Sequence, residues 1–529
     1  MKNELKKDIE ILDSTLRDGA QGEGISFSIE DKLHIVSALD ELGVKYIEAG
    51  NPGSNPKDLE FFQRAGGLHL KHAILTAFGS TRRKGISVKD DSTIVSLESA
   101  GTSAICIFGK SWDFHVTSVI CTTLEENLRM IEETLAHFAS LGKEVIFDAE
   151  HFFDGYKANS DYALACLNAA VRGGASCLAL CDTKGGSFPE EIFEATKAVL
   201  ASFPVRVGIH CHNDGGLAVA NSLAAVAAGA VHVQGTYLGF GERCGNANLC
   251  TIIANLQLKK GYHCIPDASM ENLTAMARYI AEVSNVGLAN TEPYVGKSAF
   301  AHKAGMHSDG VSKASVSFEH IAPEKVGNER RFLMSEMAGR AAVLTKINSI
   351  VPGISKESPQ TQAIIKQIKE LEMEGYQFEG ADGSFELVVR KHLGLYRPFF
   401  ELVNYKIIGE EPPVETGCSA TATIKIRVDG QPQISAAEGD GPVHALDQAL
   451  RRALNVFYPS LSTVHLTDYK VRVLEPKAAT AAKVRVLIES SDGTNLWSTV
   501  GVSTDIIEAS WKALVDSIEY KLLKDFEDK

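Results

Sequence analysis

The first half of the chain alternates short apolar runs, rich in β-branched residues, with longer stretches of helical periodicity. The apolar runs end in glycine or polar residues and occupy residues 9–12, 46–49, 73–78, 104–108, 145–149, 177–181, 205–211 and 231–237. Helical patterns lie between them, at residues 28–42, 124–141, 160–172, 189–202 and 217–228. Eight strand and helix units within about 250 residues predict an α/β fold, the closed (β/α)8 TIM barrel. An open doubly wound sheet is the alternative, but no G-x-G-x-x-G sequence follows the first run, which weakens it.

The second half of the chain has a different pattern. Residues 345–394 are helical and charged, and Ile364, Ile368 and Leu371 at helical spacing predict the core face of a connecting helix. A hairpin pattern followed by a helix then occurs twice, with the helices at residues 442–457 and 506–523. We therefore predict a catalytic barrel at 1–270, helical linker subdomains at 271–400 and a C-terminal α+β domain at 401–529. The last part has no metal-like or nucleophilic cluster, which favours binding or assembly over catalysis.

Composition excludes several classes of partner. The chain has 529 residues, 44% of them hydrophobic, which suffices for two or three domains with substantial cores. Its net charge of −14 comes without a basic block, so we expect neither nucleic acid nor an anionic membrane as partner. No apolar stretch approaches the roughly 20 residues of a membrane span, and residues 1–10 lack an apolar signal core. Ten cysteines without a C-x-x-C pair fit a reduced compartment, so we expect a cytoplasmic protein.

Acidic and imidazole side chains follow several of the predicted strands, at the end of the barrel where such folds carry out their chemistry. His210 and His212 share one face at the end of the seventh strand, because side chains alternate along a strand. Two imidazoles and one carboxylate, with positions left open, make a catalytic site for a divalent metal. Asp18, after the first strand, is the natural carboxylate, and Asn246, after the eighth, could ligate the metal or orient its surroundings.

Three motifs resemble the hallmarks of a known family. They are STLRDG at residues 14–19, HCHND at 210–214 and GFGERCGNA at 239–247. The family consists of metal-dependent barrel enzymes that condense acyl-CoA with 2-oxoacids, namely the 2-isopropylmalate, homocitrate and citramalate synthases, beside lyases that cleave the reverse bond. YIEAGNPGSNPKD, EHFFDGYKAN and the C-terminal part look most like its citramalate branch. The resemblance covers almost the full chain.

The resemblance implies a reaction and a metal. In the family, the residues corresponding to Asp18, His210 and His212 bind a divalent ion, here Zn, Mn or Mg, with that corresponding to Asn246 beside or on it. The expected reaction is a Claisen-type condensation of acetyl-CoA, the cosubstrate, with pyruvate and water to give (R)-citramalate and CoA, in isoleucine biosynthesis via 2-oxobutyrate. Another 2-oxoacid, as in 2-isopropylmalate or homocitrate synthase, stays open. Two competing functions are a 3-hydroxy-acyl-CoA lyase and a catalytically silent amino-acid sensor. The C-terminal repeat disfavours the lyase, and the intact metal motifs disfavour the sensor.

Further residues receive roles in this chemistry. Arg17 should bind substrate and stabilise the developing oxyanion. Glu150 and His307, the latter with Asp309 two residues on, are candidates for the base and for water activation, and the choice between them is open. The family delivers the histidine corresponding to His307 to the neighbouring subunit, which implies a homodimer. The positions lining the 2-oxoacid pocket in the family correspond to Glu48, His115 and Thr183.

Some positions depart from the family or have weaker signals. Ala314 and Phe318 stand where the isopropylmalate synthases have an asparagine and a tyrosine, and Lys184 stands where a neutral residue is usual. Phe78 and Phe108 either narrow the pocket towards a small 2-oxoacid or belong to the ordinary core. A basic loop at residues 82–84 either meets the phosphates of CoA or is solvated surface. The family resemblance favours a C-terminal domain regulated by the end product, isoleucine, and a plain dimerisation domain is the alternative.

Overall fold

The computed structural model describes the chain from residue 7 to residue 527, apart from residues 303–306, 308–309, 312, 333–346, 349, 352–357, 379, 410–416 and 475–480. The chain forms two compact units. The first comprises residues 1–300 and 321–330, and the second comprises residues 301–320 and 331–529. Each unit has its own hydrophobic core.

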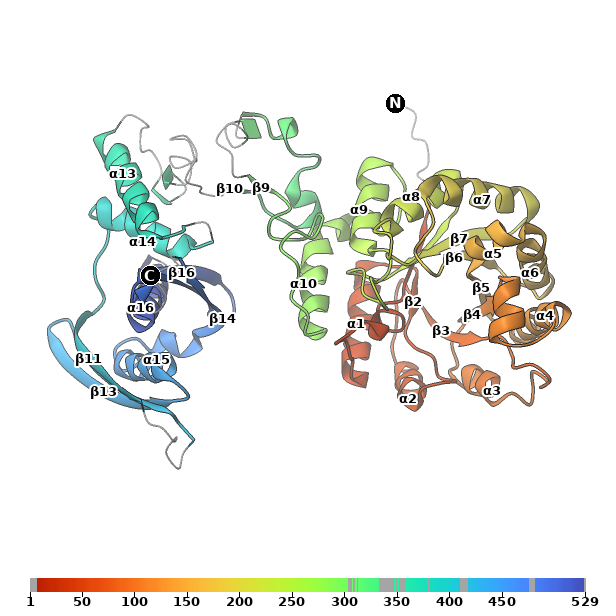
Figure 1. The fold of residues 1–529 in the computed structure, drawn as a ribbon, viewed down its shortest axis with the longest axis horizontal. Helices are drawn as coiled ribbons and strands as arrows, with labels where there is room; N and C mark the ends of the chain where they lie inside the picture. Colours follow the sequence, from red (N-terminus) through yellow and green to blue (C-terminus); the bar gives the residue numbers. More distant parts are fainter. Residues whose placement is uncertain are drawn as a thin grey trace. The chain divides into compact units, whose positions relative to one another are not determined.

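The first unit contains a closed barrel of eight parallel strands in sequential order (Figure 1). The strands are β1 (Glu10–Asp13), β2 (Tyr46–Glu48), β3 (Ile74–Ser80), β4 (Ala104–Lys110), β5 (Glu144–Glu150), β6 (Cys177–Asp182), β7 (Arg206–Cys211) and β8 (His232–Gly235). The sheet closes because β1 pairs with β8 as well as with β2, with Ile11 opposite Val233. Each predicted apolar run forms one strand. The predicted TIM barrel is therefore confirmed, and the open sheet is excluded.

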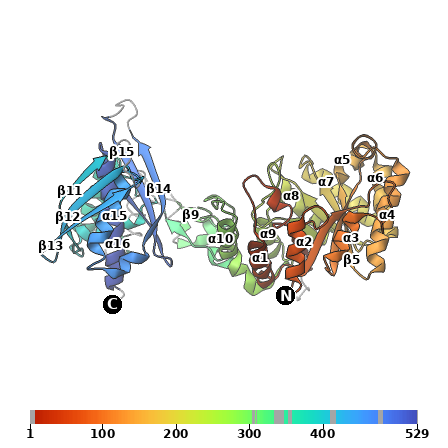
Figure 2. The ribbon, with the colours of Figure 1, turned by 90° about the horizontal axis from the view of Figure 1, so that it is seen from below.

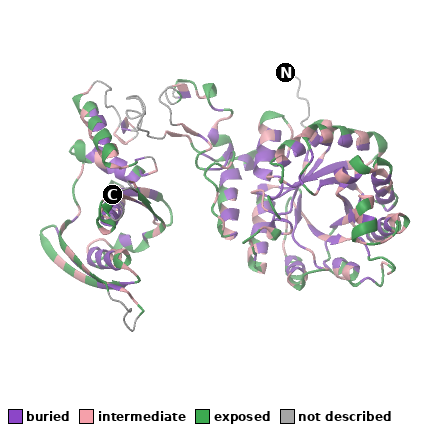
Figure 3. Ribbon diagram, viewed as in Figure 1, coloured by how far each residue is buried: buried purple, intermediate pink, exposed green. Residues whose placement is uncertain are grey.

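Helices connect successive strands and cover the outside of the barrel. They are α1 (Ile29–Leu42), α2 (Pro56–Ala65), α3 (Ser92–Ser99), α4 (Leu124–Ser140), α5 (Phe152–Ala158), α6 (Ser160–Arg172), α7 (Pro189–Ser202), α8 (Ala218–Ala228), α9 (Leu249–Lys259) and α10 (Leu273–Val283). In α1 the side chain of Ser28 accepts from the backbone N–H of Asp31, whose carboxylate accepts from the backbone N–H of Ser28, so this capping box fixes the start of the helix. Figure 3 shows the buried faces of these helices turned towards the strands.

Side chains fill the interior of the barrel. The cluster inside it comprises Leu12, Tyr46, Ala104, Cys106, Ile146, Cys177 and Ala179. Because this interior is packed, space for a ligand remains at the ends of the strands. A cavity of about 330 Å³ lies there, lined for each of the eight strands by residues from its carboxyl-terminal part or from the loop that follows it.

The second unit contains two three-stranded antiparallel sheets, each with a long helix packed on it (Figure 2). The first sheet has β11 (Glu401–Gly409), β12 (Ala420–Val428) and β13 (Gln431–Gly439) with α15 (Pro442–Leu454), and the second has β14 (His465–Val473), β15 (Val484–Ser491) and β16 (Leu496–Ser503) with α16 (Ile506–Glu527). This unit also contains a two-stranded sheet of β9 (Ala301–His302) and β10 (Arg331–Phe332), and the helices α13 (Pro359–Glu374) and α14 (Asp382–His392). Ile364 and Ile368 of α13 are buried, as their spacing predicts, and Leu371 is half-buried against the same cluster.

The predicted repeat of a hairpin and a helix is present, but the prediction missed one strand in each copy. In each copy an additional antiparallel strand, β11 or β14, precedes the hairpin. Both are edge strands with a β-bulge, and both expose most of their residues, so they show no clear apolar alternation. Among the described residues, none of the helices combines the length and the apolar character that crossing a membrane requires.

Candidate active site

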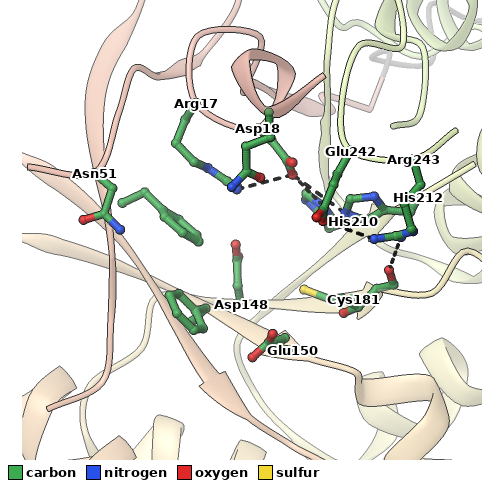
Figure 4. A pocket seen from close by; sticks show the side chains of 14 residues that line it. Arg17, Asp18, Asn51, Asp148, Glu150, Cys181, His210, His212, Glu242 and Arg243 are labelled. Carbon is green, nitrogen blue, oxygen red and sulfur yellow. Dashed lines mark hydrogen bonds and ion pairs between the residues drawn. The ribbon is translucent and has the colours of Figure 1, made fainter. Parts of the chain in front are cut away.

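Three potential metal ligands converge at the carboxyl end of the barrel. Asp18 follows β1, His210 belongs to β7, and His212 lies just beyond that strand. The Nε2 atoms of His210 and His212 lie 3.3 Å and 3.8 Å from the same oxygen, Oδ2 of Asp18. All three side chains are buried, and Figure 4 shows them at one side of the cavity. The two imidazoles that were predicted to share a face therefore meet the predicted carboxylate.

The loop after β8 brings Asn246 to this cluster. Gly245 has a φ of +83°, and a Cβ atom there would clash with the carbonyl oxygen of Gly239, so the tight loop requires glycine. The backbone of Asn246 forms a bridge with His212, and its buried Oδ1 atom has no hydrogen-bond partner among the described residues. One carboxylate, two imidazoles and an unpaired amide oxygen fit a divalent cation.

The charges of these groups are strongly coupled. Burial raises the pKa of Asp18, but Arg17, His210 and His212 outweigh it and hold that pKa well below its usual range. Burial and the neighbouring His210 lower the pKa of His212 to about 4, so this imidazole is neutral at pH 7 and keeps a lone pair. Burial opposes the charged form of His210, yet the hydrogen bond to Asp18 raises the pKa of His210 overall.

Arg17 extends over the cavity beside the potential metal ligands Asp18, His210 and His212. Its Nε donates to Oε1 of Glu48 at 2.6 Å, and its guanidinium lies 3.7 Å from the centre of the Phe78 ring. Glu48 is fully buried on β2 and is absent from the residues that line the cavity, so it orients Arg17 from behind. Burial raises the pKa of Glu48, and the charge of Arg17 opposes that rise. A direct contact of Glu48 with substrate stays a prediction.

Two other candidates, Glu150 and Thr183, line the cavity. Glu150 ends β5, and its Oε2 lies 2.5 Å from Nζ of Lys110 at the end of β4. The hydroxyl of Thr183 accepts from the backbone N–H of His151 at 2.8 Å, which leaves the hydroxyl proton for a ligand. Both side chains are therefore within reach of a ligand in the cavity.

His115 and Lys184 lie outside this cavity lining. His115 begins a short π-helical turn after β4, stacks on Trp112 and lies 4.2 Å from the ring of His151. Lys184 forms an ion pair with Asp154 at 3.0 Å and lies over the Trp112 ring. The role of His115 as a substrate contact stays a prediction, and Lys184 is held by groups outside the cavity.

His307, which the sequence predicts to reach the neighbouring subunit, belongs to the second unit. His307 is exposed, and its ring lies 4.3 Å from that of Phe318, the residue that replaces a tyrosine of the isopropylmalate synthases. Ala314 lies just before the short 3-10 helix Ser315–Ser317. Asp309 lies outside the described residues.

The structure also brings in residues that the sequence left without a role. Lys110, Asp148 and Arg243 have side chains at or near the cavity, and Gln234 of β8 connects His210 to Asp148. Asp148 and Lys110 occupy the ends of strands, which is a usable signal. The sequence signal for Gln234 is weaker, because it is only a polar residue inside an apolar run.

The sequence left two possible roles each for the pair Phe78 and Phe108 and for the basic loop at residues 82–84. Phe78 and Phe108 stack with ring centres 5.2 Å apart and both line the cavity, which favours the pocket role over the core role. The basic loop has internal partners instead: Arg82 pairs with Glu126 and Glu133, Arg83 with Asp91, and Lys84 with the carbonyls of Ile120 and Cys121. Those partners favour a structural role over a contact with CoA.

Comparisons with known proteins bear on the whole chain. Residues 8–280 match the HMGL-like family, residues 294–375 the homocitrate synthase post-HMGL domain-like family and residues 379–522 the LeuA allosteric (dimerisation) domain. The (R)-citramalate synthase of Aquifex aeolicus is 52% identical over 519 residues, covering 98% of this chain and 98% of that protein. The chain belongs to the (R)-citramalate synthase family. The (R)-citramalate synthase of Synechocystis sp. is 49% identical, over 98% of this chain and 96% of its own.

The resemblance read from three sequence motifs is thus confirmed for the family. Among solved structures, the HMG-CoA lyase of Bacillus subtilis matches with a TM-score of 0.47 and 22% identity, and the match covers 53% of this chain and 95% of that chain.

Proposed function

We propose that this protein condenses the acetyl group of acetyl-CoA with pyruvate and, with water, releases (R)-citramalate and CoA. The single observation that carries this proposal is the identity of 52% over 98% of the chain with an enzyme named (R)-citramalate synthase. The cavity supports it, because a metal cluster, an arginine and a carboxylate face one small space beside two phenylalanine rings. Such a space suits a short 2-oxoacid.

We propose that Asp18, His210 and His212, with Asn246 beside them, hold the divalent cation. A bound cation supplies positive charge that polarises the ketone and carboxylate of a 2-oxoacid. Zn, Mn and Mg remain the candidates. Arg17 reaches into the cavity, and Glu48 holds its guanidinium there, so Arg17 can stabilise the alkoxide that develops on the ketone oxygen.

The remaining residues handle protons and substrate position. Glu150, steadied by Lys110, is placed to remove a proton from the acetyl methyl group, and the resulting enolate attacks the ketone carbon of pyruvate. Water then hydrolyses the thioester, which yields the free acid and CoA. We propose that the hydroxyl of Thr183 donates to the pyruvate carboxylate, which its free proton and its position in the cavity lining support.

We further propose that the protein works as a homodimer in which His307, with Asp309, reaches the active site of the partner subunit to activate water. The match to a LeuA allosteric (dimerisation) domain supports an assembly role for residues 379–522. Isoleucine as the feedback effector, and a place in isoleucine biosynthesis, belong to the same proposal. The ten free cysteines support a reduced, cytoplasmic location.

Release of free thiol from acetyl-CoA tests the proposal. The enzyme, supplied with Mn²⁺, is assayed separately with pyruvate, 2-oxoisovalerate and 2-oxoglutarate, and the product is identified by chiral chromatography. We expect release with pyruvate to exceed the others by at least about tenfold in kcat/KM, since a small pocket discriminates by roughly 1–3 kcal/mol per added methylene. Preference for a larger 2-oxoacid would assign the protein to another branch of the family. If none of the three 2-oxoacids led to release of CoA, the synthase function would be refuted.

A further inference from the structure

A buried amide side chain links the potential metal ligands Asp18, His210 and His212 to the opposite wall of the cavity. Gln234 on β8 is fully buried, and its Oε1 lies 2.9 Å from Nδ1 of His210. Its Nε2 donates to Oδ1 of Asp148 on β5 at 2.8 Å. β5 and β8 are not neighbours in the barrel, so the Gln234 side chain crosses the interior just below the cavity.

This arrangement fixes the orientation of each partner. A carboxylate only accepts hydrogen bonds, so the NH₂ group of Gln234 faces Asp148 and its carbonyl oxygen faces His210. Nδ1 of His210 must then carry a proton, so the neutral imidazole that a cation binds has its lone pair on Nε2, the atom that otherwise donates to Asp18. That is the tautomer a metal ligand requires, and partners of this kind fix the ring orientation of metal-binding histidines.

We propose that Gln234 is a positioning residue, which holds His210 in the tautomer and orientation that bind the cation and anchors Asp148 in the wall of the substrate cavity. The inference rests on the cation site of the proposed function and adds a residue to it. Asp148 is buried, lines the cavity and faces it in Figure 4. One amide therefore sets the position of a metal ligand and of a pocket side chain together.

The test measures Mn²⁺ binding to the metal-free protein by calorimetry, without substrate. Gln234→Met keeps the length of the side chain but removes the hydrogen bonds with His210 and Asp148, and we expect the Kd for Mn²⁺ to rise about 10–100-fold. Gln257→Met is the matched control, because Gln257 is also buried and donates to Ile265 and Asp267 in the same unit, away from the cavity. Its Kd for Mn²⁺ should equal that of the unaltered protein.

Gln234→Glu provides a second, conservative variant. It keeps an acceptor for Nδ1 of His210 but loses the donor to Asp148, so the Kd for Mn²⁺ should stay within about threefold while the KM for pyruvate rises. The absorption of bound Co²⁺, which reports ligand geometry, should change in Gln234→Met and not in Gln234→Glu.

The outcomes separate this inference from the proposed function. A folded Gln234→Met protein with unchanged Mn²⁺ affinity would overturn the inference and leave the function standing. A tenfold loss of Mn²⁺ affinity in Gln234→Glu would also overturn the inference. This variant therefore still tests it if Gln234→Met does not fold. If the unaltered protein failed to bind Mn²⁺, Zn²⁺ or Co²⁺ at all, the proposed cation site would fail together with this inference.

Discussion

Lys110 and Glu150 form an ion pair at the ends of neighbouring strands, with Nζ 2.5 Å from Oε2. The two residues are register partners in the β4–β5 pairing, so the backbone itself sets them side by side. Both side chains are largely shielded from water, with 18% and 22% of their surface exposed, which strengthens their attraction relative to a surface pair. Glu150 is thereby held in one position at the edge of the cavity.

Lys110→Met should lower kcat, because Glu150 would lose the cation that fixes its carboxylate. A positioned base contributes roughly 10²–10⁴-fold to a rate, so we expect a loss of at least about tenfold. Lys110→Arg, which keeps the charge, should recover most of the activity. A Lys110→Met enzyme with an unaltered rate would show that this ion pair does not contribute to catalysis.

Removal of the divalent metal should abolish turnover while the barrel stays folded. The cluster lies at the strand ends, outside the apolar core that holds the barrel together. We expect a chelator to stop CoA release reversibly, and His212→Ala to stop it permanently, with the circular dichroism spectrum unchanged. Near-normal turnover of His212→Ala would contradict the assignment of this cluster.

Phe108→Ala should widen the range of 2-oxoacids. Phe108 stacks on Phe78 at the cavity wall, whereas Phe78 also supports Arg17, so Phe108 is the better position to alter. We expect the ratio of kcat/KM for 2-oxobutyrate to that for pyruvate to rise about tenfold. Phe138→Leu, a change in the buried core, is the control and should lower stability without altering that ratio. An unchanged ratio in Phe108→Ala would assign substrate selection elsewhere.

The stability of the second unit should fall as the pH rises from about 4.5 to 7. Burial raises the pKa of Glu519 from 4.5 to about 7, so in this window the folded state binds more protons than the unfolded state. The free energy of unfolding then decreases with pH, by on the order of 2–3 kcal/mol over the window.

Glu519→Gln should remove this slope, as measured by urea unfolding with the fluorescence of Trp497 and Trp511. Glu508→Gln on the same helix is the comparison, because hydrogen bonds with Ser503 and Lys512 lower the pKa of Glu508. Its contribution has the opposite sign, being present above pH 4.5 and lost as the pH falls through the lowered pKa. Equal pH slopes for the unaltered protein and Glu519→Gln would contradict the prediction.

The sequence predicted the barrel well because each strand and helix has a local pattern. Residues 205–211, for example, form an apolar run that ends in polar residues, and both features are visible without a structure. The sequence did not predict β11 and β14, because apolar and polar residues need not alternate along an exposed edge strand with a bulge. His115 shows another limit, because a short turn after β4 directs its ring towards Trp112 and His151 rather than into the cavity lining.

By itself, the sequence determined which residue types follow each strand, and in a barrel of parallel strands that is enough to gather Asp18, His210 and His212 at one end. Only the tertiary structure decided which partners those groups have. Gln234 beside His210, Glu48 behind Arg17 and Lys110 beside Glu150 are far apart along the chain, separated by 24, 31 and 40 residues. The physical reason is that strand register and barrel closure set these contacts, and neither is a local property of the chain.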